Sequence, residues 1–133
     1  MSGAPPQAVI TPEPGVKFPY YGPYPATIAE WHDGDTCRMV IDLGFGLAMH
    51  LSCRCYGINA PELSSGKPGA DATAAARALA PEGSQVTVLS HNWDKYGGRF
   101  LGEIRLAGGR SFAEEMISGG HARPYFGVGP KPV

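Results

Sequence analysis

The alternation of apolar and polar residues between positions 36 and 56 constrains the fold of this chain more than any other feature. Successive side chains of a strand point to opposite faces, so every second residue shares a face. On that rule residues 36–42 and 47–56 form two strands with one apolar face each, joined by a turn at residues 43–46. Arg54 lies on the polar face and is therefore predicted to lie outside the core. The predicted core residues of these strands are Cys37, Met39, Ile41, Leu51, Cys53 and Cys55.

The order of the remaining elements predicts the fold class. Residues 71–80 form the best helix, since six of the ten are alanine, the strongest helix former. Three strands, a helix, two strands and a second helix follow the order of an OB barrel. We therefore predict an α+β, mainly β, fold: a five-stranded OB-fold barrel with two short helices and no long C-terminal helix. The other elements are strands at residues 26–31, 85–89 and 99–106, a helix opened by the capping box Ser111–Glu114 and closed by Gly119-Gly120, and an extended segment at residues 121–125.

Length and proline content divide the chain into three segments. A chain of 133 residues suits one domain with one core, to which we assign residues 25–126. Seven of the 13 prolines fall within residues 1–25, and proline lacks the N–H that a paired strand uses. Residues 1–24 are therefore predicted to form an extended arm, whose aromatic side chains could dock on the domain or on a protein partner; for residues 1–15 a mostly mobile tail remains the alternative. Residues 127–133 are predicted to form a Gly/Pro-rich tail.

Composition limits the partners and the compartment of the protein. No run of about 18 apolar residues is present, so no membrane span is predicted. The N-terminus lacks the basic and apolar segments of a secretory signal, and three cysteines fit a reducing compartment, so we expect a cytoplasmic location. The Gly/Ala-rich, Lys-poor composition fits a high-GC bacterium or its phage. With a net charge of −1, phosphate binding would depend on a few placed arginines.

Acidic, amide and arginine side chains follow the predicted strands. Taken singly, each has an ordinary explanation: Asp33-Gly34-Asp35 is a turn sequence in which Gly34 permits positive φ, and a lone arginine or glutamate is usually a surface charge. Taken together, carboxylate and amide oxygens can hold a hard cation, and two arginines can neutralise the charge on a phosphate under attack. Such a set is suited to metal-assisted cleavage of a phosphodiester. Its members are Asp33, Asp35, Asn59, Glu62, Arg54 and Arg99.

Five short motifs along residues 25–126 resemble, in order and spacing, those of the staphylococcal (thermonuclease-like) nuclease family. The Asp-Gly-Asp-Thr element and the spacing from Arg54 to Pro61-Glu62 are the most specific of them. The resemblance implies a five-stranded OB barrel that cleaves DNA and RNA with Ca²⁺. The motifs are Pro25-Ala26-Thr27, Asp33-Gly34-Asp35-Thr36, Arg54 with Asn59-Ala60-Pro61-Glu62, Asp94-Lys95-Tyr96-Gly97-Gly98-Arg99, and Gly119-Gly120-His121-Ala122.

The resemblance also implies which residues would hold the metal ion. Asp35 would be the main Ca²⁺ ligand, with Asn59 and the main-chain carbonyl of Ala60 beside it. Asp33 would lie near the ion as an acid outside its immediate coordination shell. The best-known member of the family has an aspartate at the position of Asn59, so one negative charge is lost here and metal affinity should fall.

Roles in the reaction are implied in the same way. Glu62 would position or deprotonate the attacking water, and Arg54 and Arg99 would hold the scissile phosphate and stabilise the transition state. Tyr96 and Tyr125 are candidates to line the nucleotide pocket, which gives DNA, RNA or both as the expected partners.

Two alternatives remain open from the sequence. The loss of charge at Asn59, the near-neutral net charge and the aromatic arm would also fit a non-catalytic OB module that binds nucleic acid or protein. The arm and tail resemble docking extensions, so the chain could be a subunit of a larger assembly, such as that of a phage. Trp31 and Trp93 could stack on bases, but the sequence favours a wall of the core or a loop anchor for both.

Overall fold

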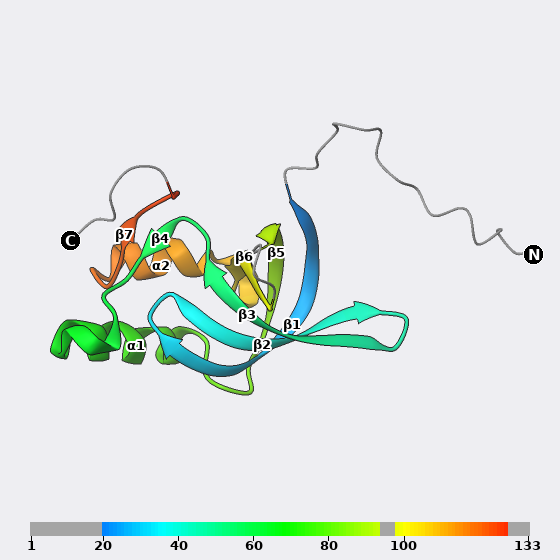
Figure 1. The fold of residues 1–133 in the computed structure, drawn as a ribbon, viewed down its shortest axis with the longest axis horizontal. Helices are drawn as coiled ribbons and strands as arrows, with labels where there is room; N and C mark the ends of the chain where they lie inside the picture. Colours follow the sequence, from blue (N-terminus) through cyan, green and yellow to red (C-terminus); the bar gives the residue numbers. More distant parts are fainter. Residues whose placement is uncertain (1–19, 94–97, 128–133) are drawn as a thin grey trace, which may run out of the picture.

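A computed structural model describes residues 20–93 and 98–127 of the chain. Its five long strands close into a barrel in the order β1-β2-β3-β6-β5 (Figure 1), which is the α+β barrel of the predicted OB type. Strands β3 and β6 run parallel, and the other neighbouring barrel strands run antiparallel. The barrel strands are β1 (Tyr21–Asp33), β2 (Thr36–Gly44), β3 (Leu47–Cys55), β5 (Gln85–Trp93) and β6 (Arg99–Arg105).

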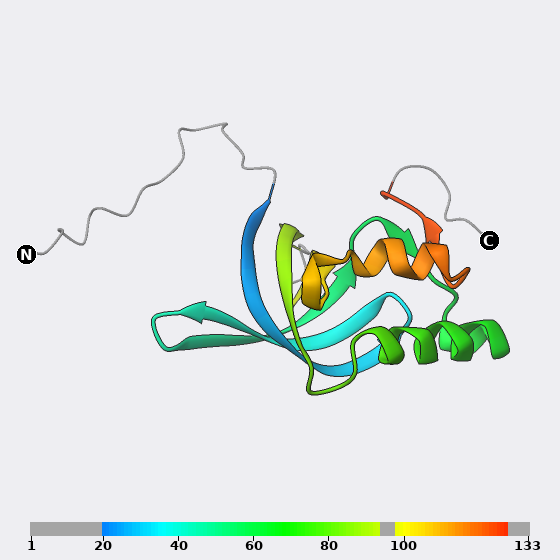
Figure 2. The ribbon, with the colours of Figure 1, turned by 180° about the vertical axis from the view of Figure 1, so that it is seen from behind.

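Smaller elements gather at one end of the barrel. Figures 1 and 2 show both helices there, while the tip of the β2–β3 hairpin projects from the opposite end. Helices α1 and α2 contact each other, and a two-stranded antiparallel sheet of β4 and β7 lies beside them. No helix of the described residues is long and apolar enough to cross a membrane. The smaller elements are β4 (Ile58–Asn59), η2 (Leu63–Ser65), α1 (Lys67–Leu79), η3 (Ala107–Gly109), α2 (Phe112–Ser118) and β7 (Arg123–Pro124).

The core follows the alternation in the sequence. Every second residue of β2 from Cys37 to Ile41 is buried, as are Cys53 and Cys55 in β3. Helix α2 adds Phe112, whose ring stacks on Trp31 of β1. The prediction that these faces form the interior is confirmed, except that Leu51 is only half-buried.

Helix α1 begins at Lys67, four residues before the predicted start at Asp71. The Pro-Gly pair at 68–69 had suggested a loop. Proline is tolerated in the first turn of a helix, where its missing N–H would have no helical partner. Gly69 is buried because the first turn packs against the main chain of Glu62. Pro68 and Gly69, which would break the interior of a helix, therefore occupy its first turn. The proline fits there, and the glycine permits close packing.

Two barrel strands are longer than predicted. Strand β1 begins at Tyr21, so the last residues of the predicted arm belong to the barrel sheet. There β1 pairs with β5 alone, and the register shifts between Tyr21 and Tyr24, which accommodates Pro23. Strand β5 continues past Leu89 to Trp93, through a polar run that hides the strand pattern. Residues 1–19 of the arm and 128–133 of the tail lie outside the described residues.

Candidate active site

The turn between β1 and β2 presents two carboxylates at one end of the barrel. The side chain of Asp33 accepts a hydrogen bond from the N–H of Asp35, with Oδ1 3.2 Å from the nitrogen. Gly34 does not take the positive φ that the sequence suggested. A Cβ at this position would instead lie 2.9 Å from the Cβ of Ala72 and 3.0 Å from that of Ala60. Glycine is therefore required here for close packing against α1 and the segment after β4.

Asp35 is buried and joins three parts of the chain. Its Oδ2 accepts a hydrogen bond from the N–H of Ala60 at 2.8 Å and lies 3.4 Å from Nη1 of Arg54. Its Oδ1 accepts a hydrogen bond from the hydroxyl of Thr36 at 3.0 Å. These contacts fix the carboxylate against β3 and against the segment that follows β4.

Arg54 is held by the chain that follows it. Its Nη1 donates to the carbonyls of Cys55 and Ile58, at 3.1 and 2.9 Å. Its Nη2 donates to Oδ1 of Asn59 at 3.3 Å. With Asp35 on one side and these acceptors on the other, the guanidinium has a fixed orientation at the barrel end.

Strand pairing brings Arg99 to the same face as Arg54. In the parallel pair of β3 and β6, Arg99 is the register partner of Ser52. Register partners share a face of the sheet, and so do residues two apart in one strand. Two arginines 45 positions apart in sequence therefore project from neighbouring strands toward the same side.

Glu62 lies immediately before η2 and is exposed. Its Oε2 accepts a weak hydrogen bond from the hydroxyl of Ser64, at 3.4 Å. Its main-chain carbonyl accepts from the N–H of Ser65 at 2.9 Å. A Cβ on Gly69 would lie only 1.9 Å from that carbonyl oxygen, so the first turn of α1 sets the position of the Glu62 main chain.

These residues line one cavity of about 430 Å³. Tyr125 is the one described residue of the predicted site that does not line it; its N–H donates to the carbonyl of Gly57. Tyr96 lies outside the described residues. The predicted site residues that line the cavity are Asp33, Asp35, Arg54, Asn59, Ala60, Glu62 and Arg99.

Burial and the neighbouring Asp35 change the protonation of Asp33. Burial, together with the side-chain hydrogen bond to the Asp35 carboxyl and the negative charge of Asp35, raises the pKa of Asp33 to about 6, although the hydrogen bond from the N–H of Asp35 acts in the opposite direction. The inner end of the cavity therefore holds an acid that stays protonated closer to neutral pH than an ordinary aspartate.

The atoms that could bind a cation at this end of the cavity are oxygens, and hard cations such as Ca²⁺ prefer oxygen ligands. Within the described residues, no group of three or more His, Cys, Asp or Glu side chains could hold a metal ion. A cation here would therefore depend on the amide of Asn59 and the carbonyl of Ala60 in addition to Asp35. The residues fit a calcium ion chemically, with fewer charged ligands than a site built from carboxylates alone.

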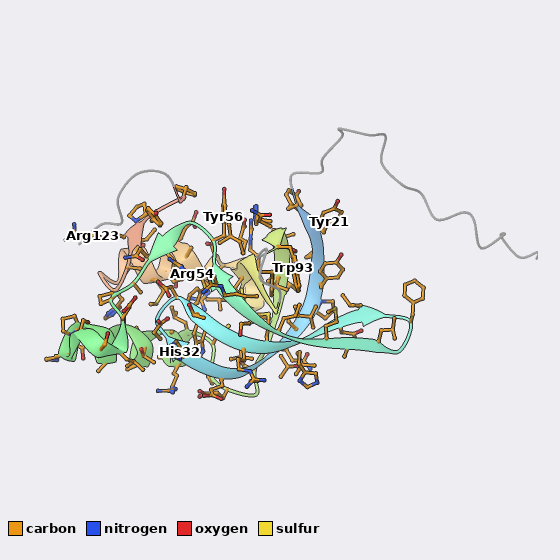
Figure 3. All side chains as sticks on the ribbon, viewed as in Figure 1. Tyr21, His32, Arg54, Tyr56, Trp93 and Arg123 are labelled. Carbon is orange, nitrogen blue, oxygen red and sulfur yellow. The ribbon has the colours of Figure 1, made fainter. Side chains whose placement is uncertain are left out.

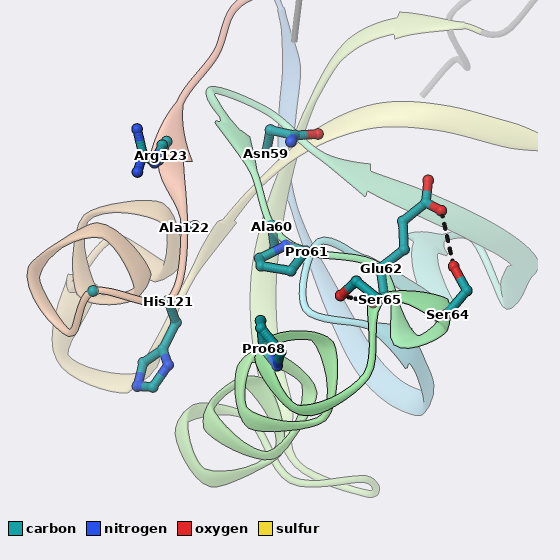
Figure 4. Close-up of a pocket in the computed structure, with 11 residues that line it drawn as sticks. Asn59, Ala60, Pro61, Glu62, Ser64, Ser65, Pro68, His121, Ala122 and Arg123 are labelled. Carbon is teal, nitrogen blue, oxygen red and sulfur yellow. Dashed lines mark hydrogen bonds between the residues drawn. The ribbon is translucent and has the colours of Figure 1, made fainter. Parts of the chain in front are cut away.

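A second, larger cavity of about 560 Å³ adjoins the first (Figure 4). The segment from Asn59 to Ser64 contributes to the walls of both cavities. His121 and Arg123 line the second one. Arg123 is the antiparallel partner of Asn59 in the pairing of β4 with β7, which puts its Cβ about 5 Å from that of Asn59 on the same face.

Sequence reasoning missed several polar residues of this region, among them His32, Thr36, Ser64 and Arg123. Thr36 donates a hydrogen bond to the carboxylate of Asp35, and Ser64 donates one to that of Glu62. Both could have been found from the sequence, because each follows its carboxylate by one or two residues. Arg123 could not be found in that way, because its position depends on a pairing between segments 64 residues apart.

One family model matches the chain. It is described as Staphylococcal nuclease homologue and covers residues 52–132, which is more than half of the chain. The match includes Arg54, Glu62 and Arg99 and begins after the turn that carries Asp33 and Asp35. A comparison with curated proteins gave no match.

Proposed function

The chain belongs to the staphylococcal nuclease homologue family, and from this premise we propose that it is a Ca²⁺-dependent nuclease that hydrolyses phosphodiester bonds of DNA, RNA or both. The observation that supports the proposal most is the shared cavity. Its side chains come from the end of β1 and the turn that follows it, from β3, from β4 and the segment after it, and from β6. Carboxylates, an amide and two arginines at one place are suited to metal-assisted attack on a phosphate.

Metal binding is assigned to the inner end of the cavity. Asp35, the amide oxygen of Asn59 and the main-chain carbonyl of Ala60 would hold the Ca²⁺, with Asp33 behind Asp35. When bound there, the ion would supply positive charge that polarises the phosphate. The hydrogen bonds to Asp35 from Ala60 and Thr36 keep its carboxylate in one orientation.

Proton transfer and phosphate binding are assigned to residues at the outer part of the cavity. Glu62 is exposed at the cavity, so a water molecule can reach its carboxylate and pass a proton to it. Arg54 and Arg99 would hold the phosphate oxygens, where two guanidiniums stabilise the extra negative charge of the transition state. The position of Arg54 is fixed by its bonds to main-chain carbonyls, so it needs little reorganisation during the reaction.

Substitution of Glu62 by glutamine tests this assignment. Glutamine keeps the size of the side chain but cannot accept the proton, so cleavage in Ca²⁺ should fall by about 10²- to 10⁴-fold. The protein should stay folded, since Glu62 is exposed. The matched control is Glu30→Gln, an exposed glutamate of β1 that does not line the cavity. Equal cleavage rates for Glu62→Gln and the unchanged protein would contradict the proposal.

One observation favours a second candidate, a non-catalytic OB module that binds nucleic acid. Arg54 donates a hydrogen bond to the amide oxygen of Asn59 and lies beside Asp35. Its positive charge therefore already neutralises part of the negative charge that a metal ion would neutralise. Such a module would bind oligonucleotides at millimolar Ca²⁺ and leave them intact. A protein partner of residues 1–24, membership of a phage assembly and a cytoplasmic location remain predictions from the sequence.

A further inference from the structure

Trp93, at the end of β5, faces the interior of the barrel and is nevertheless exposed. Its partner in the pairing of β5 with β6 is Phe100, which is 3% exposed. Directly opposed residues of paired strands share a face of the sheet, so the indole of Trp93 lies on the core-facing side. Trp93 is 52% exposed, whereas Trp31 is 2% exposed and its indole N–H donates to the carbonyl of Ala80. The prediction of a core position is confirmed for Trp31, and the barrel is open where β5 ends.

The opening is an apolar cavity of about 210 Å³, here called the barrel mouth. Tyr21 and Tyr24 from the start of β1 line it, together with Leu43, Leu51 and Trp93. Figure 3 shows Tyr21 and Trp93 on the same side of the molecule, near the start of β1. Cavities that bind small molecules usually begin at about 300 Å³, so the barrel mouth suits an apolar side chain better than a metabolite.

The strands beside the mouth extend beyond the barrel. Strand β1 pairs with β2 only as far as Ile41, and β6 pairs with β3 only from Ser52 onward. Residues 42–51 therefore form a two-stranded ribbon, with which no other described strand pairs. Two strands alone are at best marginally stable in water. An apolar group that covers Leu43 and Leu51 would therefore stabilise the ribbon as well as close the core.

The chain that precedes β1 begins at the edge of the mouth. The ring of Tyr20 lies 5.8 Å from that of His91 in β5, so the chain is still held against the barrel at the first described residue. The 19 residues before Tyr20 contain one aromatic side chain, Phe18. Three residues separate Phe18 from Tyr21 in numbering, which is at most about 10 Å of extended chain. Phe18 can therefore reach the barrel mouth.

We propose that Phe18 folds back within its own chain and that its ring fills the barrel mouth, against Trp93 and Leu43. The ring and the walls of the mouth would both lose apolar surface to water, and two aromatic rings in contact gain further stabilisation. A second copy of the chain or another protein could offer an apolar side chain too. A segment on a short tether has an effective concentration in the millimolar range, which favours Phe18 over a free partner. The inference does not rest on the proposed function.

The test is acrylamide quenching of tryptophan fluorescence in the full-length chain. The chain has two tryptophans and Trp31 is buried, so quenching reports on Trp93. Phe18→Ala uncovers the indole and should raise the quenching constant and lower the midpoint of thermal unfolding by about 4 to 8 °C. Phe18→Leu should retain most of the protection, because leucine is also apolar. The matched control is Phe45→Ala, which removes a 97% exposed ring that does not line the mouth and should change neither quantity.

A pair of substitutions tests the contact itself. Leu43→Ala should lower the unfolding midpoint less in Phe18→Ala than in the unchanged protein, because residues in contact are coupled. Equal quenching and equal midpoints for Phe18→Ala and the unchanged protein would overturn the inference. It would also be overturned if dilution from dimer to monomer removed the protection of Trp93, because the ring would then come from a second copy. None of these readouts requires cleavage, so they decide the inference whether or not the protein is a nuclease.

Discussion

At the scale of single residues, Asn59 gives the sharpest test of the proposed metal site. The best-known family member resembled by this chain has an aspartate there, and the amide found here accepts a hydrogen bond from Arg54. Asn59→Asp adds a negative charge to the oxygen set, and ligand charge is a main determinant of Ca²⁺ affinity. We expect Ca²⁺ to bind about tenfold or more tightly to the variant, as measured by titration calorimetry. Equal affinities would mean that Asn59 is not a ligand.

The three cysteines are a second case at this scale. Cys37, Cys53 and Cys55 are all free and at most 2% exposed. Hydrogen bonding with the neighbouring thiols, together with burial, raises the pKa of Cys53 well above its usual value. Reagents that attack thiolates should therefore leave all three unmodified in the native protein at pH 8 and modify them after denaturation. Modification at the rate of a free thiol in the folded protein would contradict the packing described for β2 and β3.

At the scale of elements, the first turn of α1 positions the candidate general base. A Cβ on Gly69 would collide with the carbonyl oxygen of Glu62, so Gly69→Ala should displace that segment. We expect a loss of about 1 to 3 kcal/mol in the free energy of unfolding and a fall in the cleavage rate. The control is Ala74→Gly, an exposed site in the same helix, which should cost about 1 kcal/mol of stability and leave the cleavage rate unchanged. Equal cleavage rates for both variants would show that α1 does not position Glu62.

The limits of sequence-based prediction also lie at the level of elements. Faces of β2 and β3 could be predicted because alternation is a local property, and the cap of α2 because Ser111 accepts a hydrogen bond from the N–H of Glu114 within one turn. The predicted start of α1 was wrong because Pro68 and Gly69 act through their place in the first turn and through packing against the main chain of Glu62. The pairing of β4 with β7 and the 52% exposure of Trp93, for which a core wall or a loop anchor was expected, depend on long-range register, which no local pattern contains.

For the whole molecule, closure of the barrel brings the candidate site together. The pairing of β2 with β3 brings Asp33 and Asp35, at the β1–β2 turn, beside Arg54, and the parallel pairing of β3 with β6 adds Arg99. The sequence could predict which residues take part, through their resemblance to a family. Their arrangement around one cavity needed the structure.

The most direct test of the proposed nuclease is the initial rate of cleavage of single-stranded and duplex oligonucleotides as a function of free Ca²⁺, with EDTA as the zero point. We predict no cleavage in EDTA and a rate that rises with Ca²⁺ to a plateau. A folded protein that cleaves neither substrate at any Ca²⁺ concentration, or cleaves equally well in EDTA, would contradict a Ca²⁺-dependent nuclease at this cavity.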